Sequence, residues 1–157
     1  MSIPLVVNNT TFNYPTSGDP KGWGEEATSW AEEVTLVLND LKGPNDILQS
    51  SAPIVNNQLT FIDIPLLIFD PAAVRTSTIN YNVYRLTDDQ QITESGTITI
   101  TYHTQVGMWS ITQESDFDSG ITFDVTNLGQ VQYQSTDLTG LNYQGLITFR
   151  AKTLDVI

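Results

Sequence analysis

The feature that most constrains the fold is the strict alternation of the stretch TITITY, residues 97–102. Its three threonines alternate with Ile98, Ile100 and Tyr102. Side chains of a β-strand point alternately to the two faces of a sheet, so one face of this stretch is apolar and the other is polar. The alternation therefore predicts a half-buried strand in an antiparallel sheet, with the threonines facing solvent.

From Leu59 onward the chain repeats short strand patterns bounded by turn residues. Asn127-Leu128-Gly129 is the predicted tip of a hairpin that joins Ile121–Val125 to Val131–Tyr133. About seven or eight strands at spacings of ~8–12 residues are typical of an antiparallel sandwich or a barrel-like domain. The other candidate strands are LTFIDI and LLIF, which Pro65 separates, and STINYNVYRL, MWSIT, GQVQY and LITFRA.

One segment has helical periodicity instead. Between Glu25 and Leu41, apolar residues recur at spacings of three and four, which predicts a helix with one apolar stripe. Glu25 and Glu26 suit the positive end of its dipole, and Lys42 with Gly43-Pro44 ends it. The stripe consists of Ala27, Trp30, Ala31, Val34, Leu38 and Leu41.

The predicted helix needs a partner for its stripe. A helix of about 25 Å is marginal in water unless its apolar side is packed. The stripe can pack on the downstream β-domain or on copies of the same helix. Spacings of three and four with Val34, Leu38 and Leu41 also suit a short parallel bundle, so a homotrimer is one hypothesis.

These patterns divide the chain into four segments. Residues 1–24 hold a short apolar run followed by Pro and Gly, and we expect an extended arm there. Residues 25–42 are the helix. Residues 43–58 are polar and aperiodic, which predicts a connector, and residues 59–157 are the β-domain. The predicted fold class is thus mainly β, with an N-terminal arm and one short helix.

Charge and composition exclude several classes of partner. The chain has 18 acids against 6 bases, and its net charge of −12 disfavours nucleic acid and anionic membranes. It has no cysteine, so disulfides and thiolate chemistry are excluded. The start MSIPLVVNN lacks the basic residues and long apolar run of a secretory signal, and no window is long enough to span a membrane. We expect synthesis and assembly in the cytoplasm of the cell that translates it.

His103 is the single histidine of the chain, so a general-base mechanism would depend on it. Ser110 and Asp116 follow within about a dozen residues and could complete a triad. However, no strained G-x-S-x-G turn is present, and a histidine at a strand end is more often an ordinary solvated residue. We therefore predict no catalytic residue and no enzymatic activity, although an acidic hydrolase remains an alternative.

The stretch DFDSG, from Asp116 to Gly120, begins like a calcium loop. The template requires glycine at its sixth position and glutamate at its twelfth, whereas this chain has Gly120 at the fifth and Asn127 at the twelfth. A plain turn explains the same residues. We predict no metal site and no cofactor.

The aromatic residues of the β-domain offer a second alternative, a carbohydrate-binding module. Such a sandwich could stack sugars on exposed rings. Trp109 alternates with Ile111 and is expected to be buried instead. The candidates for a stacking platform are Trp109, Tyr81, Tyr84, Tyr102 and Tyr133.

Two stretches together resemble virion proteins of tailed bacteriophages. The first, YPTSGDPKGWGEEATSWAEEVTLVLNDL, looks like their N-terminal segment, a Pro/Gly arm with a GWG turn before a short helix. The second, residues 74–154, is similar to a β-domain found at the C-terminal end of such proteins. Its matching features are the Tyr84-Arg85 pair, the Trp109-Ser110 strand, the hairpin at 129–133 and a closing strand at 145–152.

The resemblance implies a non-enzymatic structural protein of the virion. Such proteins are usually homotrimers that attach through the N-terminal segment and present the β-domain outward. This chain lacks a long shaft after its helix, so a capsid decoration (cement) protein or a short head fibre fits its size best. A tail-fibre or baseplate component is the nearest alternative. The implied partners are other copies of the chain and the major capsid protein or a tail or neck protein.

From this resemblance we predict which residues form the interfaces. An arm orders on a surface, where each buried aromatic contributes about 2 kcal/mol or more. Three-fold symmetry strengthens such an attachment through avidity. The predicted attachment residues are Ile3, Leu5, Val7, Tyr14 and Trp23, and the predicted trimer residues are Trp30, Val34, Leu38 and Leu41.

Overall fold

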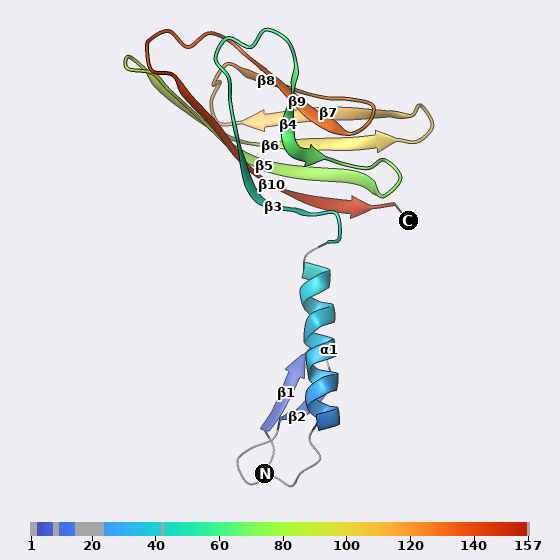
Figure 1. The fold of residues 1–157 in the computed structure, drawn as a ribbon. Helices are drawn as coiled ribbons and strands as arrows, with labels where there is room; N and C mark the ends of the chain where they lie inside the picture. The colour runs from blue at the N-terminus through green and yellow to red at the C-terminus, as the bar shows by residue number, and fades with distance from the viewer. Residues whose placement is uncertain (1–2, 8–9, 15–23, 42, 157) are drawn as a thin grey trace. The chain divides into compact units, whose positions relative to one another are not determined.

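A computed structural model describes residues 3–7, 10–14, 24–41 and 43–156. The chain divides into two compact units (Figure 1), an N-terminal unit of Met1–Pro44 and a C-terminal unit of Asn45–Ile157. Each unit is described by itself below.

The N-terminal unit contains two strands and a helix. Strands β1 (Ile3–Val7) and β2 (Thr10–Tyr14) pair antiparallel, with Ile3 opposite Tyr14 and Leu5 opposite Phe12. Helix α1 (Gly24–Leu41) contacts both strands and confirms the predicted helix. The extended arm predicted for residues 1–24 is instead a strand pair over residues 3–7 and 10–14, because both runs are β-prone and only two residues lie between them. Residues 15–23 of that arm lie outside the described residues.

The C-terminal unit is a sandwich of two antiparallel sheets. Strands β3, β10, β5, β6 and β7 form the five-stranded sheet in that order, and β4, β9 and β8 form the three-stranded sheet (Figure 1). Their bounds are β3 Ile47–Pro53, β4 Ile62–Ile68, β5 Val74–Leu86, β6 Gln91–His103, β7 Met108–Ser115, β8 Ile121–Val125, β9 Gln130–Ser135 and β10 Gln144–Asp155. The predicted fold class, an antiparallel sandwich of about seven or eight strands, is confirmed.

The core lies between the sheets, where the alternation placed it. On β6, Ile98 and Ile100 are fully buried, whereas Thr97, Thr99 and Thr101 lie on the opposite face. Thr126 accepts the Gly129 N–H at 2.9 Å in the turn between β8 and β9, and this confirms the predicted hairpin tip. Other buried core residues are Ile64, Leu67, Phe69, Ile79, Val83, Phe123, Val131, Ile147 and Phe149.

The prediction of a connector at residues 43–58 was wrong, because this range contains β3. The strand pairs antiparallel with β10 and forms one edge of the five-stranded sheet, so the sandwich begins well before residue 59. An edge strand is hydrogen-bonded on one side only, and much of β3 is exposed. Its sequence ILQSSAP mixes apolar and polar residues without the alternation that marks a half-buried strand.

Pro65 does not separate two strands as predicted but lies within β4. The pairing of β4 with β9 shifts register between Asp63 and Ile68, and Leu66 has a φ of 69°. Because proline cannot donate to the ladder, it occurs at edge strands and at such irregularities. Leu66 is also 69% exposed, so β4 carries a leucine in the left-handed region at the surface.

Candidate functional site

The predicted attachment residues lie mostly in the hairpin of the N-terminal unit. Ile3, Leu5 and Val7 belong to β1, and Tyr14 ends β2 opposite Ile3. The pairing brings the two predicted attachment stretches together at the backbone. Trp23 lies outside the described residues.

The predicted trimer residues all belong to α1. Trp30 and Val34 are half-buried, whereas Ser29, Ala31 and Thr35 on the same helix are exposed. Trp30 and Val34 thus fit the predicted stripe, whereas Ala31, which the prediction also assigned to the stripe, is exposed. Leu38 and Leu41 also lie on α1, but their side chains are outside the described part.

The aromatic residues considered as a sugar platform mostly belong to the core. Trp109, Tyr81 and Tyr133 are buried, as expected for Trp109. The Tyr81 ring packs edge-on against Phe123, with centroids 5.0 Å apart. Tyr84 and Tyr102 are half-buried, so these two are the members of the set whose rings remain partly accessible.

The structure brings two members of the considered triad together. His103 Nε2 lies 2.9 Å from Ser110 Oγ, and both residues are exposed. Asp116 instead accepts a hydrogen bond from the Ser95 N–H at the far end of the β6–β7 pair. At ~3.4 Å per residue, that end is more than about 20 Å from His103. No triad forms from these three residues.

The loop DFDSG is organised as a turn. Asp118 Oδ1 accepts the Gly120 N–H at 2.8 Å, and Gly120 has a φ of 75°. Within the described residues, no group of three or more potential ligands of the His, Cys, Asp and Glu types is placed to hold a metal ion. Within the same residues, no helix combines the length and apolarity needed to cross a membrane.

A buried arginine holds this loop to the sandwich. Arg85 on β5 is only 1% exposed, and its guanidinium donates four hydrogen bonds to uncharged acceptors. Its Nη1 donates to the Ser119 carbonyl at 2.5 Å, and its Nη2 donates to the Thr136 carbonyl at 2.6 Å. The other two acceptors are Asn56 Oδ1 at 2.8 Å and the Tyr143 hydroxyl at 3.2 Å. Arg85 therefore ties three loops to β5, those between β3 and β4, between β7 and β8 and between β9 and β10.

A buried glutamate binds the backbone N–H of Ser119, the residue whose carbonyl accepts from Arg85. Glu94 on β6 is 1% exposed, and its Oε2 accepts the Ser119 N–H at 2.7 Å. Its Oε1 accepts hydrogen bonds from the Tyr81 hydroxyl and from Gln113. Burial, and then the hydrogen bond to Glu94, raise the pKa of Tyr81 well above its ordinary value. Ser119 is thus bracketed by two buried groups of opposite charge, and sequence reasoning identified neither of them.

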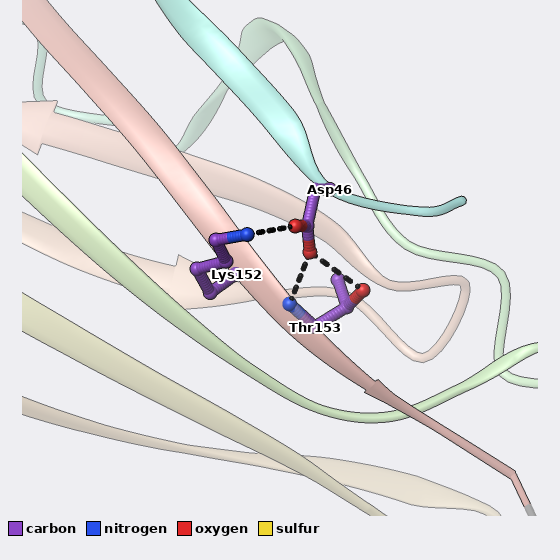
Figure 2. Close-up of polar contacts among 3 residues, drawn as sticks. All are labelled: Asp46, Lys152 and Thr153. Atoms are coloured by element: carbon purple, nitrogen blue, oxygen red, sulfur yellow. Dashed lines mark hydrogen bonds and ion pairs between the residues drawn. The ribbon is translucent and has the colours of Figure 1, made fainter. Parts of the chain in front are cut away.

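A third set of polar contacts joins Asp46, just before β3, to Lys152 and Thr153 of β10 (Figure 2). The Asp46 side chain is 4% exposed, although it lies just before β3. Its Oδ2 accepts Lys152 Nζ at 2.6 Å, and its Oδ1 accepts the Thr153 N–H at 2.7 Å and the Thr153 hydroxyl at 3.1 Å. These bonds fix the start of β3 to the last third of β10.

The outer face of the five-stranded sheet has an open hollow of about 180 Å³. We call it the β3–β10–β5 hollow. Its outward-facing lining consists of Gln49 from β3, Thr148 and Arg150 from β10, and Asn80 and Asn82 from β5. These residues form no motif along the sequence, and the only signal for them is that each occupies a polar position of an alternating or edge strand.

Comparisons with known proteins give only weak structural similarity. No known protein family matches the chain, and no curated protein matches its sequence. Among solved structures, the chain is similar to the Acinetobacter phage vB_ApiP_P1 tailspike protein, with a TM-score of 0.42 and 10% sequence identity. The match covers 68% of this chain and 21% of that one, so the chain spans about a fifth of its length.

Proposed function

We propose that the chain is a non-enzymatic structural component of a tailed-phage virion, a trimeric capsid decoration (cement) or head-fibre protein. Its N-terminal unit attaches to the particle and its β-domain faces outward. The partners are two further copies of the chain and the major capsid protein or a tail or neck protein. Assembly takes place in the host cytoplasm.

The observation that carries this proposal is the division into two compact units, a small one with a helix and two strands and a larger β-sandwich. The C-terminal unit has its own core between two sheets, with Ile64, Ile79 and Ile147 fully buried. It does not depend on the N-terminal unit to bury these residues. The N-terminal unit is a hairpin and one amphipathic helix, which is too small to build a large core of its own. Such a unit gains stability by packing on another surface.

The first experiment tests self-association. Sedimentation equilibrium of the full chain at tens of micromolar is expected to give three times the mass of one chain. Val34→Asp on α1 is expected to weaken the association at least tenfold, because it places a charge on the half-buried side of the helix. Trp30→Ala is expected to act in the same direction.

The matched control is Ser29→Asp, which adds the same charge on an exposed position of the same helix. It should leave the trimer intact. A wild-type chain that sediments as a monomer at these concentrations would contradict the proposed trimer. So would Val34→Asp and Ser29→Asp variants that associate equally well.

The second experiment tests attachment. A chain beginning at Asn45 is expected to fold, because the sandwich core lies wholly within residues 45–157. It should give a dispersed NMR spectrum and a cooperative unfolding transition but should be missing from purified particles, as measured by mass spectrometry. A shortened chain that still joins particles would rule out the N-terminal unit as the attachment element. Imaging labelled full-length chains on particles separates a head location from the alternative, a tail-fibre or baseplate component.

A second candidate function, carbohydrate binding, is favoured by the β3–β10–β5 hollow. It collects amide, hydroxyl and guanidinium groups on an exposed sheet face, and such groups are the usual partners of sugar hydroxyls. It is compatible with a structural role in the virion, since the hollow and the N-terminal unit involve different residues.

A further inference from the structure

The β3–β10–β5 hollow lies beside an irregularity in the edge of the sheet. The pairing of β10 with β3 passes from Phe149 opposite Ser50 to Ala151 opposite Ile47. Two residues of β3, Leu48 and Gln49, therefore lie against Arg150 alone. An irregularity of this kind bends the strand and redirects side chains, and such features often occur beside functional sites.

The groups around the hollow have free hydrogen-bonding capacity. Arg150 is exposed, and its side chain makes no hydrogen bond or ion pair with any residue that the structure describes. Asn80 Oδ1 accepts a weak 3.5 Å bond from Thr97, which leaves the Asn80 amide NH₂ for a ligand. Asn82 Nδ2 donates to Ser95 at 2.8 Å, which leaves the Asn82 carbonyl oxygen as an acceptor. The hollow thus offers donors, acceptors and one uncompensated positive charge.

The positive charge is notable because the chain is strongly acidic, with 18 acids against 6 bases. The cross-strand row that contains Arg150 continues through Asn80 and Thr97 to Glu114. Three strand spacings of ~4.8 Å place Glu114 about 14 Å from Arg150. Asp46, which precedes β3, contacts β10 two to three residues beyond Arg150, but its carboxylate already accepts bonds from Lys152 and Thr153. An anionic group at Arg150 therefore meets little local repulsion.

An aromatic side chain lies along the same face. Tyr84 shares the outward side of β5 with Asn82 and Asn80 and is half-buried. Four residues at ~3.4 Å separate Tyr84 from Asn80 by about 13 Å. The outward side of β5 therefore presents the Tyr84 ring, which can stack on a sugar, followed by the amides of Asn82 and Asn80. The Arg150 guanidinium lies beside Asn80 on β10.

We propose that the β3–β10–β5 hollow binds a saccharide that carries a carboxylate, with the carboxylate on Arg150 and the sugar hydroxyls on Gln49, Asn80 and Asn82. The next sugar ring packs against Tyr84. A guanidinium suits a carboxylate because its parallel N–H groups match the two oxygens. This inference deepens the second proposed function and does not depend on how the chain attaches to a particle.

The test is NMR titration of the ¹⁵N-labelled full chain with three acidic probes, trigalacturonic acid, a trimer of alginate and 3′-sialyllactose. At least one probe is expected to shift the amide signals of Gln49, Asn80, Asn82, Thr148 and Arg150. For trigalacturonic acid, the neutral control is its fully methyl-esterified form, which has the same ring skeleton without the charges. Arg150→Gln is expected to weaken binding of the active probe about tenfold or more.

The matched control variant is Gln105→Glu, which changes the net charge by the same one unit at an exposed position outside the hollow. It should bind within about twofold of the wild type, since distant exposed charges are screened by salt. Because Arg150 is exposed, its replacement should leave the free spectrum dispersed and the fold intact. Particle incorporation of Arg150→Gln should equal that of the wild type, which separates this site from the attachment function.

Three results would each overturn the proposal. The first is that none of the three acidic probes shifts the signals of the hollow. The second is that Arg150→Gln binds as tightly as the wild type. The third is that esterified trigalacturonic acid binds as well as the free acid. A purely structural sheet face gives the first of these results.

Discussion

Replacing Arg85 with alanine is expected to lower the free energy of unfolding by about 3–5 kcal/mol. Arg85 is almost fully buried and donates to the carbonyls of Ser119 and Thr136, to Asn56 and to Tyr143. Without it, the Ser119 carbonyl and the Tyr143 hydroxyl lose the arginine donor, and Asn56 Oδ1 and the Thr136 carbonyl each keep only one donor, the Leu138 and Asn57 N–H groups. The buried Glu94, which accepts from the same Ser119, loses the nearby positive charge. Urea denaturation followed by tryptophan fluorescence measures the change.

Two further variants test this interpretation, one that keeps the charge of Arg85 and one at an exposed arginine as the control. Arg85→Lys keeps the charge but cannot reproduce the planar set of donors, so it should still lose most of the stability. Arg150→Ala removes an arginine from the surface of the same sheet, and it should change the free energy of unfolding by about 0.5 kcal/mol or less. If Arg85→Ala and Arg150→Ala had similar effects, the buried guanidinium would not be holding the loops together.

The second large effect is expected at Gly129, where alanine should cost about 2–5 kcal/mol. Gly129 has a φ of 82°, in the region that L-residues with a side chain avoid. A Cβ there would lie 1.9 Å from the Phe69 carbonyl oxygen and 3.2 Å from Trp109 Nε1. The Phe69 N–H also donates to the Gly129 carbonyl at 3.0 Å, so the two backbones cannot separate without losing this bond.

Gly107 supplies the matched control for this prediction. It has a similar φ of 67°, but a Cβ there would meet only the Tyr102 hydroxyl at 3.9 Å, which is ordinary contact. Gly107→Ala should therefore cost only the backbone term of about 1–2 kcal/mol. The difference between the two variants, measured by thermal and urea unfolding, isolates the overlap with Phe69. Equal losses at the two positions would contradict a close approach of the backbones at Gly129.

Local patterns in the sequence were sufficient to predict most of the strands. The alternation of residues 97–102 identified β6 and which of its faces is buried. Spacings of three and four identified α1, and Asn127-Leu128-Gly129 identified the turn between β8 and β9. The strand and helix predictions succeeded because side chains recur on one face every 2 residues in a strand and every 3.6 residues in a helix.

The errors occurred where the partner of a segment is distant in the sequence. β3 carries no alternation, and its pairing with β10, about a hundred residues later, makes it a strand. The hairpin of β1 and β2 was missed for a related reason, since Ile3–Val7 was considered as a single run without its partner Thr10–Tyr14. Patterns of one segment do not report which other segment it pairs with.

The sequence by itself therefore determined the fold class, the strands that alternate, the helix and the acidic charge of the chain. Only the tertiary structure decided that Arg85 and Glu94 are buried on either side of Ser119, and that Arg150 lies beside Gln49 and Asn80. The physical reason is that periodicity is a property of neighbouring residues, whereas the cost of burying a charge depends on acceptors brought from distant segments. A site assembled from three strands is visible only after those strands have paired.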